Sequence, residues 1–174
     1  MLELVLGGAR SGKSAYAETL ASNSGLKVVY LATATVQDNE MAVRIQRHQA
    51  DRPDNWGLIE EPLMLAETLR QHANSQTCIL IDCLTLWLTN LLLHPDTKLF
   101  AQQRQALLDV LPTLTGQIVM VSNEVGQGIV PENALARRFI DEAGWLHQDL
   151  ARLCDKVTLI SAGLPLTLKG IKND

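Results

Sequence analysis

Short, continuous apolar runs alternate with segments of helical periodicity along most of the chain. The apolar runs predict buried strands, because a strand covered on both faces is apolar at nearly every position. They lie at 2–6, 27–33, 77–82, 117–122 and 156–160, with a short edge strand at 58–59 and a last strand at 164–169. Spacings of three and four residues predict helices at about 15–21, 39–51, 62–69, 84–93, 99–114 and 132–154. This alternation predicts an α/β architecture of three layers, a mainly parallel sheet with helices on both faces.

Two details of the pattern refine this prediction. Pro165 favours an edge position for the last strand, because proline cannot donate a hydrogen bond to a neighbouring strand. The longest predicted helix has one apolar stripe, made by residues that recur every three or four positions. Its members are Leu135, Phe139, Ala143, Leu146, Leu150 and Leu153.

Composition narrows the class of protein without identifying it. The 174 residues are expected to form a single domain, 1–174. A formal net charge of −4 gives no basic surface, so nucleic acid is not an expected partner. No apolar run is long enough to span a membrane, and the N-terminus does not resemble a signal peptide. Cys78, Cys83 and Cys154 form no C-x-x-C pair, which predicts reduced thiols in a cytoplasmic protein.

The first strand leads directly into a glycine-rich loop with the spacing G-x-x-x-x-G-K-[ST]. Backbone N–H groups of such a loop turn toward a phosphate chain, and the following helix N-terminus adds about half a positive charge. Lys13 is predicted to reach the β- and γ-phosphates, and Ser14 to coordinate Mg²⁺. A glycine turn with a surface lysine is the alternative, but a strand before and a helix after favour a nucleoside triphosphate site in a P-loop NTPase-type fold. This phosphate-binding loop is Gly7, Gly8, Ala9, Arg10, Ser11, Gly12, Lys13 and Ser14.

Asp82 stands at the end of the apolar run 77–82. In nucleotide-hydrolysing folds a carboxylate in this position helps to hold the water shell of Mg²⁺. An aspartate before a predicted helix can instead serve as its N-cap. We expect Asp82 to act with Ser14 on the metal.

Charged side chains gather on the helix predicted at 39–51. Arg44, Arg47, His48 and Asp51 share one face by their spacing, and Arg52 follows the helix. Guanidinium groups lower the pKa of a nearby imidazole, and a neutral imidazole is a nucleophile. The same guanidiniums could hold the phosphate that it attacks. On these residues alone, an exposed histidine on a charged helix face is the simpler interpretation.

The stretch Asn123–Asn133 follows a buried strand and contains Gly126 and Gly128. Its place at the carboxyl edge of the sheet suits a mobile lid, and it equally suits a plain connection to the last helix. We expect His72, His94 and His147 at the surface or in turns. Trp56, Trp87 and Trp145 fit either the core or an apolar binding surface; their spacing does not decide, and the core is the expected place for each.

Three motifs together resemble a known family. They are the phosphate-binding loop, the series Arg44-Ile45…His48…Arg52-Pro53…Trp56…Glu60, and Asn123-Glu124-Val125-Gly126…Gly128-Ile129-Val130-Pro131. In this order they look like the bifunctional adenosylcobinamide kinase/adenosylcobinamide-phosphate guanylyltransferase family. The resemblance implies phosphorylation of the aminopropanol hydroxyl of adenosylcobinamide by ATP or GTP. It also implies transfer of GMP from GTP to that phosphate, which gives adenosylcobinamide-GDP in adenosylcobalamin biosynthesis.

The resemblance also implies roles for particular residues. A histidine on the helix after the second strand is guanylylated in this family, and His48 occupies that place. Further contacts to GTP are implied for Ala32, Thr33, Ala34, Gln49, Ala50, Asp51, Arg52, Glu60 and Asp82. The implied cofactors are GTP, ATP and Mg²⁺, the implied substrate is a corrinoid, and the implied assembly is a homo-oligomer such as a trimer.

Two other functions fit parts of the sequence. A kinase acting on another small alcohol needs the glycine loop but forms no covalent nucleotide intermediate. A nucleotide-dependent switch protein is disfavoured, because the chain has no Asn/Thr-Lys-x-Asp motif for reading guanine. Hydrolysis by a switch protein would be indifferent to the corrinoid.

Overall fold

A computed structural model describes residues 1–34, 53 and 55–170 of the chain. Its centre is a seven-stranded sheet with the order β3-β2-β4-β5-β1-β6-β7. All neighbouring strands are parallel except β6 and β7, which form an antiparallel pair at one edge. The strands are β1 Leu2–Gly7, β2 Lys27–Ala32, β3 Gly57–Glu60, β4 Thr77–Asp82, β5 Gln117–Asn123, β6 Lys156–Ser161 and β7 Leu164–Lys169. The predicted strands, and the edge position of the last one, are confirmed.

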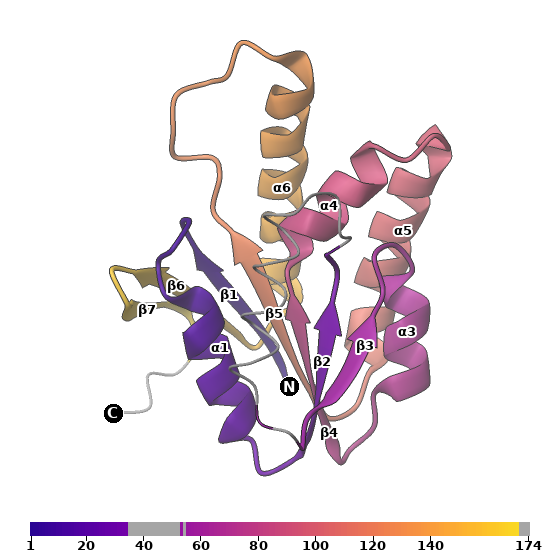
Figure 1. Cartoon of the computed structure of the whole chain (residues 1–174), viewed down its shortest axis with the longest axis vertical. Coiled ribbons are helices and arrows are strands. Elements are labelled where there is room, and N and C mark those ends of the chain that lie inside the picture. The colour runs from indigo at the N-terminus through magenta and orange to yellow at the C-terminus, as the bar shows by residue number, and fades with distance from the viewer. Residues whose placement is uncertain (35–52, 54, 171–174) are drawn as a thin grey trace.

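Helices cover both faces of this sheet (Figure 1). One face carries α1 (Lys13–Ser22), whose Ala17 and Ala21 are fully buried against the sheet. The other face carries the remaining described helices around a larger apolar core that includes Trp87. They are α3 Leu65–His72, α4 Leu84–Leu92, α5 Thr97–Val110 and α6 Ala134–Leu153, with a 3-10 turn at Leu111–Thr113. The three-layer α/β prediction is therefore confirmed.

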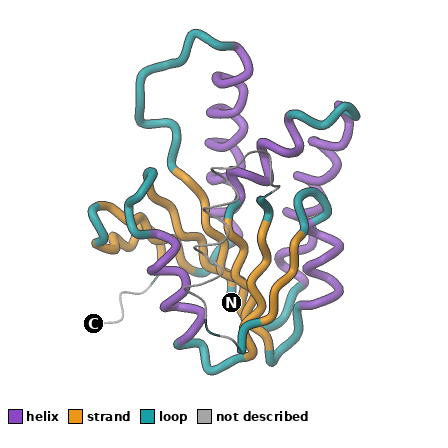
Figure 2. The backbone as a smooth tube through the Cα atoms, in the orientation of Figure 1, coloured by secondary structure: helices purple, strands orange, loops and turns teal. Residues whose placement is uncertain are grey.

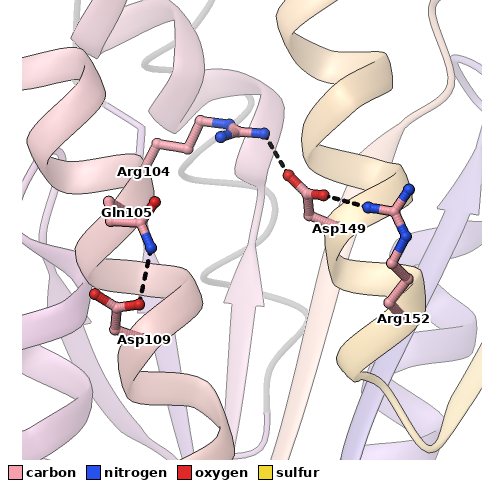
Figure 3. A network of polar contacts seen from close by, with 5 residues as sticks. All are labelled: Arg104, Gln105, Asp109, Asp149 and Arg152. Atoms are coloured by element: carbon pink, nitrogen blue, oxygen red, sulfur yellow. Dashed lines mark hydrogen bonds and ion pairs between the residues drawn. The ribbon is translucent and has the colours of Figure 1, made fainter.

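An ion pair joins α5 to α6 on the outer side of the larger core (Figure 3). Arg104 Nη2 on α5 donates a hydrogen bond to Asp149 Oδ2 on α6. Arg152 Nη1 donates to the second oxygen, Asp149 Oδ1, at 2.6 Å. Of these two bonds, only the Arg104 bond crosses from α5 to α6, because Arg152 and Asp149 both lie on α6, where their contact orients the Asp149 carboxylate.

The start of α3 differs from the prediction. Glu61 Oε1 accepts hydrogen bonds from the backbone N–H groups of Leu63 at 2.8 Å and Met64 at 2.7 Å. This turn occupies residues that were expected to be helical from Pro62, so the helix begins only at Leu65. The helix predicted at 84–93 is confirmed as α4, Leu84–Leu92. The helix predicted at 99–114 begins two residues earlier, at Thr97, because the Asp96 side chain caps α5 by accepting from the Lys98 N–H at 2.9 Å.

The apolar stripe of α6 is confirmed only in its later turns. Ala143, Leu146 and Leu150 are fully buried, whereas Leu135 near the start of the helix is 46% exposed. In Figure 1 the first turns of α6 rise beyond the carboxyl ends of the strands, where the sheet no longer covers them. The core prediction is right for Trp87 and wrong for Trp145, which is 54% exposed.

Candidate active site

The carboxyl ends of the parallel strands bring the predicted site residues to one edge of the sheet. Strand register places Ala32 on β2 beside Glu60 on β3 and beside Asp82 on β4. β5 lies between β4 and β1, and its Asn123 pairs in register with Gly7. Ligands of open α/β sheets bind at this edge. The described candidate residues therefore lie along the edge of the sheet formed by the carboxyl ends of its strands.

The phosphate-binding loop connects β1 to α1 and approaches other backbone closely. A Cβ atom on Gly7 would lie 2.4 Å from Ser11 Oγ and 2.8 Å from the Ile160 carbonyl oxygen. Gly12 is the N-cap of α1 and has a φ of 96°, a left-handed conformation that favours glycine. The first N–H groups of a helix have no partner within it, and Gly12 has no side chain to satisfy them. They are therefore available to an anion.

Lys13 is positioned over this loop. Its side chain is 9% exposed, and its Nζ donates a hydrogen bond to the Gly8 carbonyl oxygen at 3.1 Å. Ser14 follows it in the first turn of α1 and is half-buried. An ammonium group held over a glycine-rich loop, at the N-terminus of a helix, is suited to bind a polyphosphate chain.

Two neighbouring segments hold the loop backbone in place. The Glu124 N–H, just after β5, donates to the Gly7 carbonyl oxygen at 3.0 Å. On the other side, the Gly163 N–H donates to the Ser11 carbonyl oxygen at 2.8 Å. Gly163 and Ala162 form the turn between β6 and β7, with positive φ values of 78° and 50°. The loop therefore lies between β5 and the edge hairpin.

The two adjacent glycines of the loop should respond differently to an added methyl group. Gly7→Ala is expected to destabilise the protein by about 1–3 kcal/mol, because the Ile160 carbonyl is backbone and cannot turn aside. Gly8→Ala is the matched control, since an added Cβ there meets no atom within 4 Å. Urea denaturation without nucleotide measures both free energies of unfolding. Equal stability of the two variants would contradict the close approach at Gly7.

Asp82 lies at the end of β4, next to a buried polar network. The Tyr30 hydroxyl donates to Asp82 Oδ2 at 3.1 Å. Beside it, Thr33 Oγ1 donates to the Cys83 carbonyl oxygen at 2.7 Å, and Asn123 Nδ2 donates to Thr85 Oγ1 at 3.0 Å. These bonds fix the ends of β2, β4 and β5 relative to one another. The backbone that carries Asp82 is therefore held in place. The Asp82 side chain does not cap α4, which rules out the alternative role considered for it.

The cysteines of the chain are free thiols, as predicted. Burial raises the pKa of Cys78 to about 11 and that of Cys154 to about 12. Burial also raises the pKa of Cys83, and the nearby Asp82 charge adds to the effect. All of these thiols are protonated near neutral pH, so they are poor nucleophiles.

The surface prediction for His147 is wrong. This residue is 7% exposed on the inner face of α6, and its Nε2 lies 2.7 Å from Ser122 Oγ at the end of β5. Burial lowers its pKa, and the negative charge of Glu124 offsets part of that effect. The sequence did hold a signal, because His147 follows Ala143 by four residues and precedes Leu150 by three. It therefore belongs to the apolar stripe.

Several predicted residues lie outside the part of the chain that the structure describes. They are the helix predicted at 39–51 and, within or just after it, Arg44, Arg47, His48, Gln49, Ala50, Asp51 and Arg52. Among the predicted contacts that are described, Thr33 is buried, Ala32 and Ala34 are half-buried, and Glu60 is exposed. The 124–133 connection between β5 and α6 is long (Figure 2), and Ile129 within it is 97% exposed. None of the described helices is long and apolar enough to cross a membrane.

The sheet, the loop and the first turn of α1 define a P-loop nucleotide-binding protein. Solved structures agree on the fold. An ATPase of the type III secretion system of pathogenic bacteria aligns with a TM-score of 0.57 and 12% identity, over 95% of this chain and 57% of that one. The assembled ATPase EscN of enteropathogenic E. coli aligns with a TM-score of 0.55 and 11% identity, over 92% of this chain and 43% of that one.

Sequence comparison identifies the family. Residues 3–168 match the family described as cobinamide kinase/cobinamide phosphate guanyltransferase, and the chain belongs to this family. The bifunctional adenosylcobalamin biosynthesis protein CobP of Pseudomonas aeruginosa is 56% identical over 170 residues, which cover 98% of each chain. The bifunctional adenosylcobalamin biosynthesis protein CobU of Escherichia coli is 38% identical, over 97% of this chain and 100% of that protein. The family resemblance of the three motifs is confirmed.

Proposed function

We propose that this chain, acting as one catalytic domain, phosphorylates adenosylcobinamide with ATP or GTP and then converts the product to adenosylcobinamide-GDP. The second reaction transfers GMP from GTP and releases pyrophosphate. The observation that carries the proposal is the family match over residues 3–168, which includes an intact phosphate-binding loop on a P-loop fold. Kinase and guanylyl transfer both start from a triphosphate seated on that loop.

The kinase step requires a positioned and neutralised γ-phosphate. Lys13, at 9% exposure and over the loop, is assigned to the β- and γ-phosphates. The amides of residues 8–14 hold the same phosphates, and the N-terminus of α1 adds a favourable field. Phosphoryl transfer depends mainly on such positioning and charge neutralisation, so these parts account for most of the catalysis that this step needs.

Ser14 and Asp82 are assigned to Mg²⁺. Among the described residues no group of three or more His, Cys, Asp or Glu side chains is placed to hold a metal by itself. A hydroxyl and a carboxylate fit Mg²⁺, which takes few protein ligands when it binds with nucleotide phosphates and water. When bound, Mg²⁺ would neutralise charge on the triphosphate.

The guanylyl step is assigned to His48. A ring nitrogen of His48 attacks the α-phosphorus, the bond to the β-phosphate oxygen breaks, and pyrophosphate leaves. An oxygen of the corrinoid phosphate then attacks the same phosphorus and releases the imidazole, which divides a difficult transfer into two steps. Contacts to GTP are proposed for Ala32, Thr33, Ala34, Gln49, Ala50, Asp51, Arg52, Glu60 and Asp82, whose described members share the carboxyl edge of β2, β3 and β4.

We also propose that the protein works as a homo-oligomer such as a trimer. The side chains of Ile129, Val130 and Leu135, around the start of α6, are 97%, 75% and 46% exposed. Neighbouring apolar side chains exposed in this way are typical of surfaces that a partner covers. A site shared between subunits would also suit a ligand as large as a corrinoid.

The direct test follows the corrinoid through both reactions. With adenosylcobinamide, Mg²⁺ and ATP alone, mass spectrometry should show one added phosphate. Adding GTP should convert that product to adenosylcobinamide-GDP with release of pyrophosphate. A reaction that stops at the phosphate despite GTP would indicate a kinase only. Nucleotide hydrolysis that ignores the corrinoid, with no corrinoid product, would refute the proposal in favour of a switch protein.

A further inference from the structure

The sheet order singles out the end of β5 as a place for acid–base chemistry. β5 lies between β1, which carries the phosphate-binding loop, and β4, which ends at Asp82. Residues that follow β5 therefore lie between the phosphate-binding loop, assigned to the triphosphate, and Asp82, assigned to its metal ion. The first residue past the strand is Glu124, a half-buried carboxylate.

Local contacts hold Glu124 in a defined position. Its backbone N–H donates to the carbonyl oxygen of Gly7, the first glycine of the loop, at 3.0 Å. Its side-chain Oε1 accepts a hydrogen bond from the Gly126 N–H at 2.7 Å. This contact occupies one lone pair of one carboxylate oxygen, so the group keeps capacity to accept a proton. The main chain of Glu124 is thus anchored to the loop, and its side chain is anchored to the Gly126 amide of the connection that follows β5.

The nearby imidazole on α6 does not pair with the Glu124 carboxylate. His147 is buried, and its Nε2 is engaged with Ser122 Oγ at 2.7 Å, two residues before Glu124. Because burial lowers its pKa, this imidazole is neutral near pH 7 and does not form an ion pair with the carboxylate. The Ser122–His147 contact also fixes the end of β5 from which Glu124 projects.

The other described acid–base groups at this edge are less suited to act beside the loop. Asp82 receives a hydrogen bond from the Tyr30 hydroxyl and is assigned to Mg²⁺. Glu60 ends β3, which β2, β4 and β5 separate from β1. Glu61 Oε1 is engaged by the N–H groups of Leu63 and Met64.

We propose that Glu124 is the proton acceptor of the kinase reaction. The acceptor alcohol gives its hydroxyl proton to the Glu124 carboxylate while its oxygen forms a bond to the γ-phosphorus. The bond from that phosphorus to the β,γ-bridging oxygen breaks, and the nucleoside diphosphate leaves. The proton on Glu124 then passes to water. This inference rests on the proposed kinase function and adds to it the residue that activates the alcohol.

The guanylyl half of the reaction makes the test selective. In guanylyl transfer the acceptor is the phosphate of adenosylcobinamide phosphate, which is already ionised and needs no base. Glu124→Gln keeps an oxygen for the Gly126 N–H but cannot take up a proton. We expect its kinase kcat with adenosylcobinamide to fall about a hundredfold, the lower end for loss of a general base. Guanylyl transfer to adenosylcobinamide phosphate should stay within about threefold of the wild type, since folding and the nucleotide seat are unchanged.

Glu132→Gln is the matched control, because Glu132 is an exposed carboxylate at the far end of the same connection. It should leave both rates unchanged. An E124Q variant that keeps its kinase rate, or that loses both reactions equally, would overturn the role of Glu124 in proton transfer. A wild-type protein that transfers no phosphate to adenosylcobinamide would instead refute the proposed function itself.

Discussion

Replacing His48 with alanine is expected to abolish covalent labelling of the protein by α-labelled GTP. The proposed intermediate has a phosphorus–nitrogen bond, so the wild-type label should be labile in acid and stable in alkali. Without the imidazole, guanylyl transfer to adenosylcobinamide phosphate should fall about a thousandfold or more, as expected for loss of a covalent nucleophile. The kinase reaction transfers the γ-phosphoryl group directly to the alcohol, so it should continue at a rate close to that of the wild type.

The matched control is His72→Ala, which removes an exposed imidazole at the end of α3. It should leave labelling and both activities unchanged. Full labelling of the His48 variant would show that another residue carries the nucleotide. A loss of the kinase reaction of similar size would show that His48 serves the nucleotide site in general rather than the guanylyl step.

Lys13→Met is expected to impair both reactions together. Methionine fills much of the same space, but it removes the ammonium group that is held 3.1 Å from the Gly8 carbonyl oxygen, over the loop. The γ-phosphate in the kinase reaction and the departing pyrophosphate in the guanylyl reaction then both lose the ammonium group assigned to them. We expect kcat/KM of each reaction to fall about a thousandfold, at the upper end for loss of one electrostatic stabiliser.

Steady-state assays of the two half-reactions, each started from its own corrinoid substrate, measure this effect. Lys27→Met is the control, because Lys27 is an exposed lysine at the opposite end of the sheet, at the start of β2. If the Lys13 variant lost kinase activity and kept guanylyl transfer, the two reactions would use different binding sites for the triphosphate. That outcome would contradict a shared loop.

Local sequence was sufficient to predict the parts of the site whose geometry is local. The phosphate-binding loop needs only a strand, a turn of fixed spacing and a helix start, and all of these are contiguous from Leu2 to Ser22. Continuous apolar runs located β4 and β5 within a residue, because buried parallel strands tolerate few polar positions. Asp82 could be placed at the carboxyl edge for the same reason.

Contacts between distant segments could not be predicted in this way. His147 pairs with Ser122, 25 residues earlier, and periodicity alone does not reveal that a polar side chain has a buried partner. The side-chain turn made by Glu61 displaced the start of α3. The position of Glu124 next to the loop follows from the order of strands in the sheet, with β5 inserted between β4 and β1. Apolar runs do not encode that order.

The two hydrogen bonds that flank the phosphate-binding loop have an energetic consequence for its ligand. The N–H groups of Glu124 and Gly163 already bind the carbonyl oxygens of Gly7 and Ser11, so the loop is ordered before a nucleotide binds. Little binding free energy is therefore spent on ordering the chain. Affinity for phosphate therefore depends on a hairpin turn encoded near the C-terminus. Ala162 and Gly163 adopt left-handed backbone, so a β-branched residue at either position would weaken nucleotide binding from a distance.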